Sequence, residues 1–131
     1  MDSQTFTVPN RLASYAELFG TATNNTNDLR RRESYNTQLV VWAIKSAKIK
    51  RVLGSCRVRI KWVEPTPARL PAHVAAAAVF VQQGLVDAGI VKDPMRILGI
   101  YSTFAVNARE PRVEVTIEGA YGGEADGEHR A

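Results

Sequence analysis

The chain has 131 residues, of which 45% are hydrophobic and 23% are charged, a composition that suits one compact domain and excludes disordered and fibrous classes. Seventeen Lys and Arg residues against 13 acidic residues give a net charge of +4, which permits a nucleic-acid partner without requiring one. No apolar run reaches the roughly 20 residues of a membrane-spanning helix, and the N-terminus lacks a signal-peptide pattern, so we expect a cytoplasmic protein.

The first half of the chain predicts a strand, a loop and a long helix. Weak alternation over residues 5–8, ending at Pro9, indicates a short strand. The polar run within residues 18–27 predicts a mobile loop, and an apolar stripe at helical spacing predicts a helix over about residues 28–48. Trp42 lies on that stripe, so we expect it in the core.

The clearest strand follows Gly54, where hydrophobic and basic residues alternate with a period of two. Its inward side chains are predicted to be Cys56, Val58, Ile60 and Trp62. Cys56 is the single cysteine of the chain, which excludes an intrachain disulfide and suits a small buried residue.

The second half predicts a helix over residues 72–88, ended by Gly89, and then strands over residues 97–106 and 112–118. Residues 119–131 are small, polar and charged, which predicts a flexible tail after a single domain of residues 1–118. The order of elements indicates an α/β domain in which two helices pack on one mixed β-sheet.

The segment from Trp62 to Val74 is similar to the part of RusA-like Holliday-junction resolvases in which a strand leads through a basic, proline-containing loop into a helix. That family carries an Asp-x-Asp-Asn motif there, and later an Ala-Gly-Val/Ile-x-x-Asp-Asp turn that residues 88–94 resemble. Residues 8–12 and 110–118 resemble its opening and its final strand. The resemblance covers roughly residues 5–118, and it implies a homodimer, because a four-way junction has two strands that are cut symmetrically.

The departures from this family concern the residues that bind metal. Leu70 and Ala72 stand in place of the motif aspartates, and His73 replaces the asparagine. In the later turn Asp93 matches the first acid, but Pro94 replaces the acid that binds metal in the family. The family uses Mg²⁺, which prefers carboxylate oxygens, so the resemblance implies a pseudo-enzyme with no catalytic residue and no cofactor.

Asp93 is most simply a turn residue and His73 a residue of the first helical turn. A remnant metal site that joins Asp93 to Glu64 or His73 is the weaker alternative.

Basic residues form two clusters that are candidates for contact with DNA phosphates. The first comprises Arg57, Arg59 and Lys61 on the outward face of the strand, leading toward Arg69. A solvated strand face explains it equally well. The second comprises Lys45, Lys48, Lys50 and Arg51, and both clusters would form one track if they lay on the same side.

Three functions follow as hypotheses. The leading one is a RusA-like protein of phage or prophage origin, in DNA recombination and repair, which binds branched or duplex DNA without cutting it. The second is an active Mg²⁺-dependent junction endonuclease with a rearranged site built from Glu64, His73 and Asp93. The third is a repurposed nuclease fold that binds a host protein.

Overall fold

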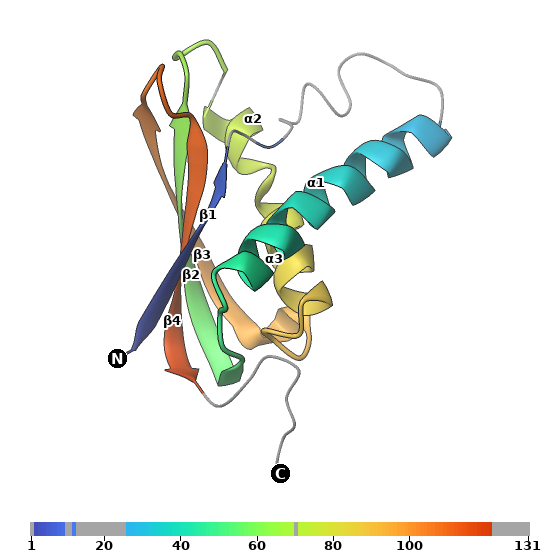
Figure 1. Cartoon of the computed structure of the whole chain (residues 1–131), viewed down its shortest axis with the longest axis vertical. Helices are drawn as coiled ribbons and strands as arrows, with labels where there is room; N and C mark the ends of the chain where they lie inside the picture. Colours follow the sequence, from blue (N-terminus) through green and yellow to red (C-terminus); the bar gives the residue numbers. More distant parts are fainter. Residues whose placement is uncertain (1, 10–11, 13–25, 70, 122–131) are drawn as a thin grey trace.

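The computed structural model describes residues 2–9, 12, 26–69 and 71–121. A four-stranded sheet has the order β1-β4-β2-β3, and helices cover one of its faces (Figure 1). The elements in chain order are β1 (Ser3–Pro9), α1 (Thr26–Ser46), β2 (Val52–Glu64), α2 (Pro71–Ala75), α3 (Ala78–Asp87), the 3₁₀ helix η2 (Pro94–Arg96), β3 (Ile97–Val106) and β4 (Arg112–Tyr121). The predicted small α/β domain with a mixed sheet and helices packed on it is confirmed.

The sheet is mixed because β2 pairs parallel to β3 and antiparallel to β4. β1 pairs antiparallel to β4 at the far edge. The parallel pair is joined through α2 and α3, as a crossover between parallel strands requires.

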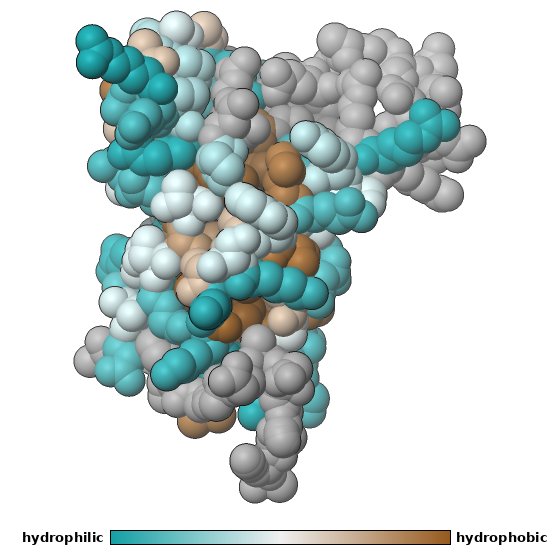
Figure 2. All heavy atoms as spheres, viewed as in Figure 1, coloured by the Kyte–Doolittle hydropathy of each residue, from teal (hydrophilic) through white to brown (hydrophobic). Residues whose placement is uncertain are grey.

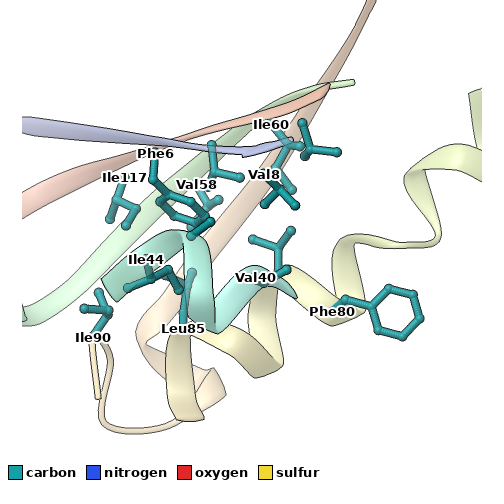
Figure 3. Packing of buried hydrophobic residues seen from close by; sticks show 14 of the residues in the cluster. Phe6, Val8, Val40, Ile44, Val58, Ile60, Phe80, Leu85, Ile90 and Ile117 are labelled. Carbon is teal, nitrogen blue, oxygen red and sulfur yellow. The ribbon is translucent and has the colours of Figure 1, made fainter. Parts of the chain in front are cut away.

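The core lies between the sheet and the helices. Side chains from the strands and from α1 and α3 point toward one another across this layer (Figure 3). The predicted inward residues of β2 are all buried, and Trp62 donates an indole hydrogen bond of 2.9 Å to the hydroxyl of Ser102. In the view of Figure 2, hydrophobic residues gather along the middle, where the helices meet the sheet, and hydrophilic residues surround them.

The predicted core position of Trp42 is wrong, because its side chain is 59% exposed. Val40, Ala43 and Ile44 face the sheet, whereas Trp42 and Tyr35 lie on a flank of α1 that no described residue buries. The apolar stripe of the helix is therefore broader in sequence than the face that it buries.

The predicted single helix over residues 72–88 is two helices, α2 and α3, with a break at Ala76 and Ala77. Bonds from Ala77 N to Val74 O and from Phe80 N to Ala77 O span three residues and tighten the chain there. Val74, Ala77 and Phe80 are all buried, so the tightened turn packs against the core. The alanine run does not continue as one α-helix, in spite of the high helix propensity of alanine.

Strand β2 begins at Val52, whereas the sequence predicted that the strand would start only after Gly54. Gly54 has φ +82° at a bulge between Leu53 and Cys56, a conformation that glycine adopts readily.

Two predicted boundaries of the domain shift in the structure. β4 continues to Tyr121 by pairing with the early part of β2, so the predicted tail from residue 119 begins within a strand. Helix α1 begins at Thr26, within the predicted loop of residues 18–27, while residues 18–25 lie outside the described residues.

Candidate nucleic-acid interface

No described element covers the face of the sheet opposite the helices, called the open face below, and this face carries the predicted basic row of β2. Arg57, Arg59 and Lys61 are all exposed there, because they alternate with the buried Val58 and Ile60. The register places Tyr101 of β3 and Thr116 of β4 on either side of Arg59. The predicted outward orientation of this row is confirmed.

Glutamates of β4 lie beside the basic row, a neighbourhood that sequence reasoning missed. Glu118 is opposite Arg57 in the register and Glu114 is opposite Lys61. Glu118 instead pairs with Arg59 at 3.0 Å, on the diagonal. Glu114 pairs with Arg112 of its own strand at 2.6 Å. The alternation of acids in β4 was visible in the sequence, but the strand that it faces was not.

Arg57 and Lys61 consequently form no ion pair with any residue that the structure describes. They are four residues apart on one strand, which at about 3.3 Å per residue separates them by roughly 13 Å. The open face therefore offers two exposed cations whose nearest acids are engaged by other arginines.

Tyr101 is a further member of this face that sequence reasoning did not single out. The guanidinium carbon of Arg59 lies 5.6 Å from the centre of its ring, within cation–π range. A Cβ atom built on Gly99 would lie 2.7 Å from the Tyr101 hydroxyl, so the glycine leaves room for the ring to lie along the strand. Arg59 is held from two sides and is less available to a ligand than Arg57 or Lys61.

A shallow hollow of about 360 Å³ adjoins this row at the bulge of β2. Its lining includes Leu53, Arg57, Leu98 and Glu118. It combines the Arg57 cation with the carboxylates of Asp2 and Glu118 and with apolar surface at the start of β2.

The second basic cluster does not continue the row on the open face. Lys45 is exposed on α1, in the layer that covers the other face of the sheet. Lys48, Lys50 and Arg51 lie in the connection between α1 and β2. There the backbone N–H of Lys50 donates to the side-chain oxygen of Gln4 at 2.8 Å, and the backbone oxygen of Lys50 accepts from the side-chain nitrogen of Gln4 at 2.9 Å. The single track expected if both clusters shared one side is not formed, because Lys45 and Arg57 lie on opposite sides of the sheet.

Arg69 has a structural partner rather than the predicted open position on a DNA track. Its guanidinium donates to both carboxylate oxygens of Glu64, at 2.6 and 2.7 Å, and to the backbone oxygen of Leu12 at 3.2 Å. The side chains of Arg69 and Glu64 are only 13% and 8% exposed. This pair fixes the segment after β2 and leaves neither residue open to a phosphate or a metal ion.

Two of the positions that the resemblance assigns to metal-binding acids, Ala72 and Pro94, do not meet within one chain. Ala72 lies on α2, beyond the end of β2, and Leu70 lies outside the described residues. Pro94 begins η2, which leads into β3 where Ile97 pairs with Cys56 near the start of β2. Figure 1 shows α2 at one end of the sheet and the turn between α3 and β3 at the other.

Glu64 and Asp93 are separated by the same geometry. Cys56 and Glu64 are eight residues apart along β2, or roughly 26 Å at about 3.3 Å per residue. The prediction of a metal site that joins Asp93 to Glu64 or to His73 of α2 within one chain is therefore wrong. Asp93 is a turn residue, as predicted, because its carboxylate accepts a hydrogen bond of 2.9 Å from Met95 N and caps η2.

Mg²⁺ does not fit the acidic residues near these positions. Among residues 2–9, 12, 26–69 and 71–121, no three His, Cys, Asp or Glu side chains come together to hold a metal ion. Glu64, the one buried carboxylate among the described residues, already accepts two hydrogen bonds from Arg69.

The chain matches no protein-family model and no curated protein. In the part of the chain that the structure describes, no helix is both long and apolar enough to cross a membrane.

Proposed function

We propose that this chain is a RusA-like protein that binds branched DNA, such as a Holliday junction, through the open face of its sheet and does not cleave it. The proposal rests on the resemblance over residues 5–118 and assigns the protein to DNA recombination and repair, in a phage or prophage setting. The resemblance also implies a homodimer that engages the two-fold symmetric strands of a junction.

The observation that supports the DNA contact is the exposure of Arg57 and Lys61 beside acids that are engaged elsewhere. Both are exposed on an open sheet face, and the two glutamates beside them are held by Arg59 and Arg112. When exposed cations neutralise DNA phosphates, the counterions condensed on the DNA are released. This release favours binding to any DNA backbone. Selection of a branched structure would come from the spacing of two such faces in a dimer.

The absence of cleavage is supported by the side chains at the family's acid positions. Ala72 and Pro94 offer no oxygen ligand, and the carboxylate of Asp93 caps a turn. Hydrolysis by the family mechanism needs carboxylates that fix Mg²⁺ and an attacking water.

The test is binding of purified protein to a synthetic four-way junction and to a matched duplex, with and without Mg²⁺, over about 50 to 200 mM salt. Arg57→Gln with Lys61→Gln is expected to weaken binding and to lower the magnitude of the slope of log affinity against log salt by about 2 for each protomer in contact with the DNA, or about 4 for the dimer. Lys45→Gln with Lys48→Gln removes the same charge from the helix side and is expected to leave the slope unchanged.

The other outcomes separate the alternatives. Mg²⁺-dependent cutting of the junction would overturn the non-cleaving assignment. A slope that falls only in the Lys45 and Lys48 variant would move the DNA contact to the helix side. Absence of any binding to DNA would overturn the proposal and favour a protein partner.

A further inference from the structure

The edge strand β3 has an open side. In the order β1-β4-β2-β3, β3 pairs with β2 alone, so the backbone groups along its other side have no strand partner among the described residues. β3 has 10 residues, whereas the opposite edge strand, β1, has seven and ends at Pro9. An open strand edge is a template for pairing with another strand.

The sequence of β3 lacks charge and proline, two features that commonly protect an edge, and a bulge at Leu98 interrupts only its start. Residues Ile97–Val106 include no charged side chain and no proline. Charged side chains and prolines are the common means by which proteins prevent edge pairing. The adjacent strand β2 carries three basic residues, so the absence of charge is particular to the edge.

Large hydrophobic side chains accompany the open edge. Leu98, Tyr101, Phe104 and Val106 are exposed by 61%, 47%, 44% and 55%. Phe104 pairs in register with the inward Trp62, and Tyr101 with the outward Arg59, so apolar groups stand exposed on both faces of the strand. Exposed apolar side chains that gather along one strand are typical of an interaction site.

We propose that a second copy of this chain pairs with β3, strand to strand and antiparallel, to form a continuous eight-stranded sheet across a two-fold axis. A two-fold interface must be complementary to itself, and an uncharged strand can lie opposite its own copy without like-charge repulsion. Apolar side chains on both faces of one edge then meet their equivalents across the axis.

The pairing has a consequence for the open faces. An axis perpendicular to the sheet keeps the outward faces of both copies on one side, so the two rows that contain Arg57 and Lys61 form one composite surface. The interface itself involves no DNA contact; it rests on the homodimer of the proposed function and names the surface through which the two copies join, while the salt dependence of DNA binding tests that function separately.

The test is sedimentation equilibrium of the full chain without DNA. Thr103 is exposed near the middle of β3, on the same face as Lys61, so Thr103→Lys places two lysines close together at the axis. We expect a dimer whose Kd rises by at least about tenfold in this variant through like-charge repulsion. Thr7→Lys makes the same change on β1, where Thr7 is exposed, and is expected to leave the Kd unchanged.

Hydrogen exchange provides a second measurement that needs no variant. Amides of β3 are expected to become more protected as the protein concentration rises through the Kd, whereas amides of β1 are not. A parent protein that stays monomeric at about 100 µM, well above the micromolar Kd of ordinary specific interfaces, would overturn the proposal. A dimer whose Kd is the same in Thr103→Lys, or whose β3 amides show no added protection, would also overturn it.

Discussion

The guanidinium of Arg69 donates hydrogen bonds of 2.6 and 2.7 Å to the two carboxylate oxygens of Glu64, the last residue of β2. A third hydrogen bond, from Arg69 to the backbone oxygen of Leu12, ties the chain beyond β1 to the same group. The segment that leaves β2 is thus fixed by charge at the place where the sequence had suggested a ligand for DNA or metal.

Removal of one partner from this pair is expected to destabilise the protein strongly. Glu64→Ala leaves the buried Arg69 cation without its carboxylate and should lower the free energy of unfolding by about 3–5 kcal/mol. Glu64→Leu combined with Arg69→Met removes both charges and should recover most of that loss. Urea unfolding measures both. Glu110→Ala is the control, because Glu110 is 77% exposed and lies 4.0 Å from Arg112, so its loss should cost less than about 1 kcal/mol.

Gly84 is the point of closest approach between α3 and α1. A Cβ atom at Gly84 would lie 2.5 Å from Cγ1 and 2.9 Å from Cβ of Val40, which is fully buried. Gly84→Ala should therefore destabilise the protein by about 1–3 kcal/mol, in spite of the higher helix propensity of alanine. A Val40→Ala background removes the 2.5 Å contact with Cγ1 and keeps the 2.9 Å contact with Cβ, so the penalty should shrink without disappearing. An equal penalty in both backgrounds would refute the contact as its cause.

The alternation around β2 predicted the fold well because period-two patterning is a local property. Cys56, Val58 and Ile60 are buried and Arg57 is exposed, as the pattern requires. The long helix and the last two strands were likewise predicted by patterns within a few residues. The break near Ala77 was not, because an alanine-rich run has high helix propensity and its local pattern contains no signal for a break.

The candidate site was predictable in its residues and not in its neighbours. The exposed row containing Arg57 and Lys61 follows from alternation, but the register that brings Glu114 and Glu118 beside it depends on which strands pair. The separation of Asp93 from Glu64 likewise depends on the direction of β3 relative to β2. Such long-range relationships are set by topology, on which a local pattern carries little information.

Asp93 is expected to matter for stability and not for metal binding. Asp93→Ala removes the acceptor for Met95 N and should cost about 0.5–2 kcal/mol, while Asp93→Asn keeps an acceptor and should cost less. Thermal unfolding with and without millimolar Mg²⁺ measures both effects. A ligand that binds the native state raises Tm, so we expect no Mg²⁺-dependent rise in the parent protein. A rise that disappears in Asp93→Asn would instead identify Asp93 as a metal ligand.

Cys56 should make stability depend on pH in the alkaline range. Burial raises the pKa of its thiol, because the thiolate is poorly solvated beneath the sheet. The native state therefore keeps a proton that the unfolded chain releases at its ordinary pKa of about 8.5. Since the native state binds more protons, this contribution to stability is complete below the unfolded pKa and is lost as pH rises toward the folded value. Urea unfolding at a series of pH values from about 7 to 10 spans that window. Cys56→Ala lowers stability throughout by loss of packing, but its stability should fall less steeply with pH than that of the parent. Parallel pH profiles for the two proteins would show that the thiol does not titrate differently on folding.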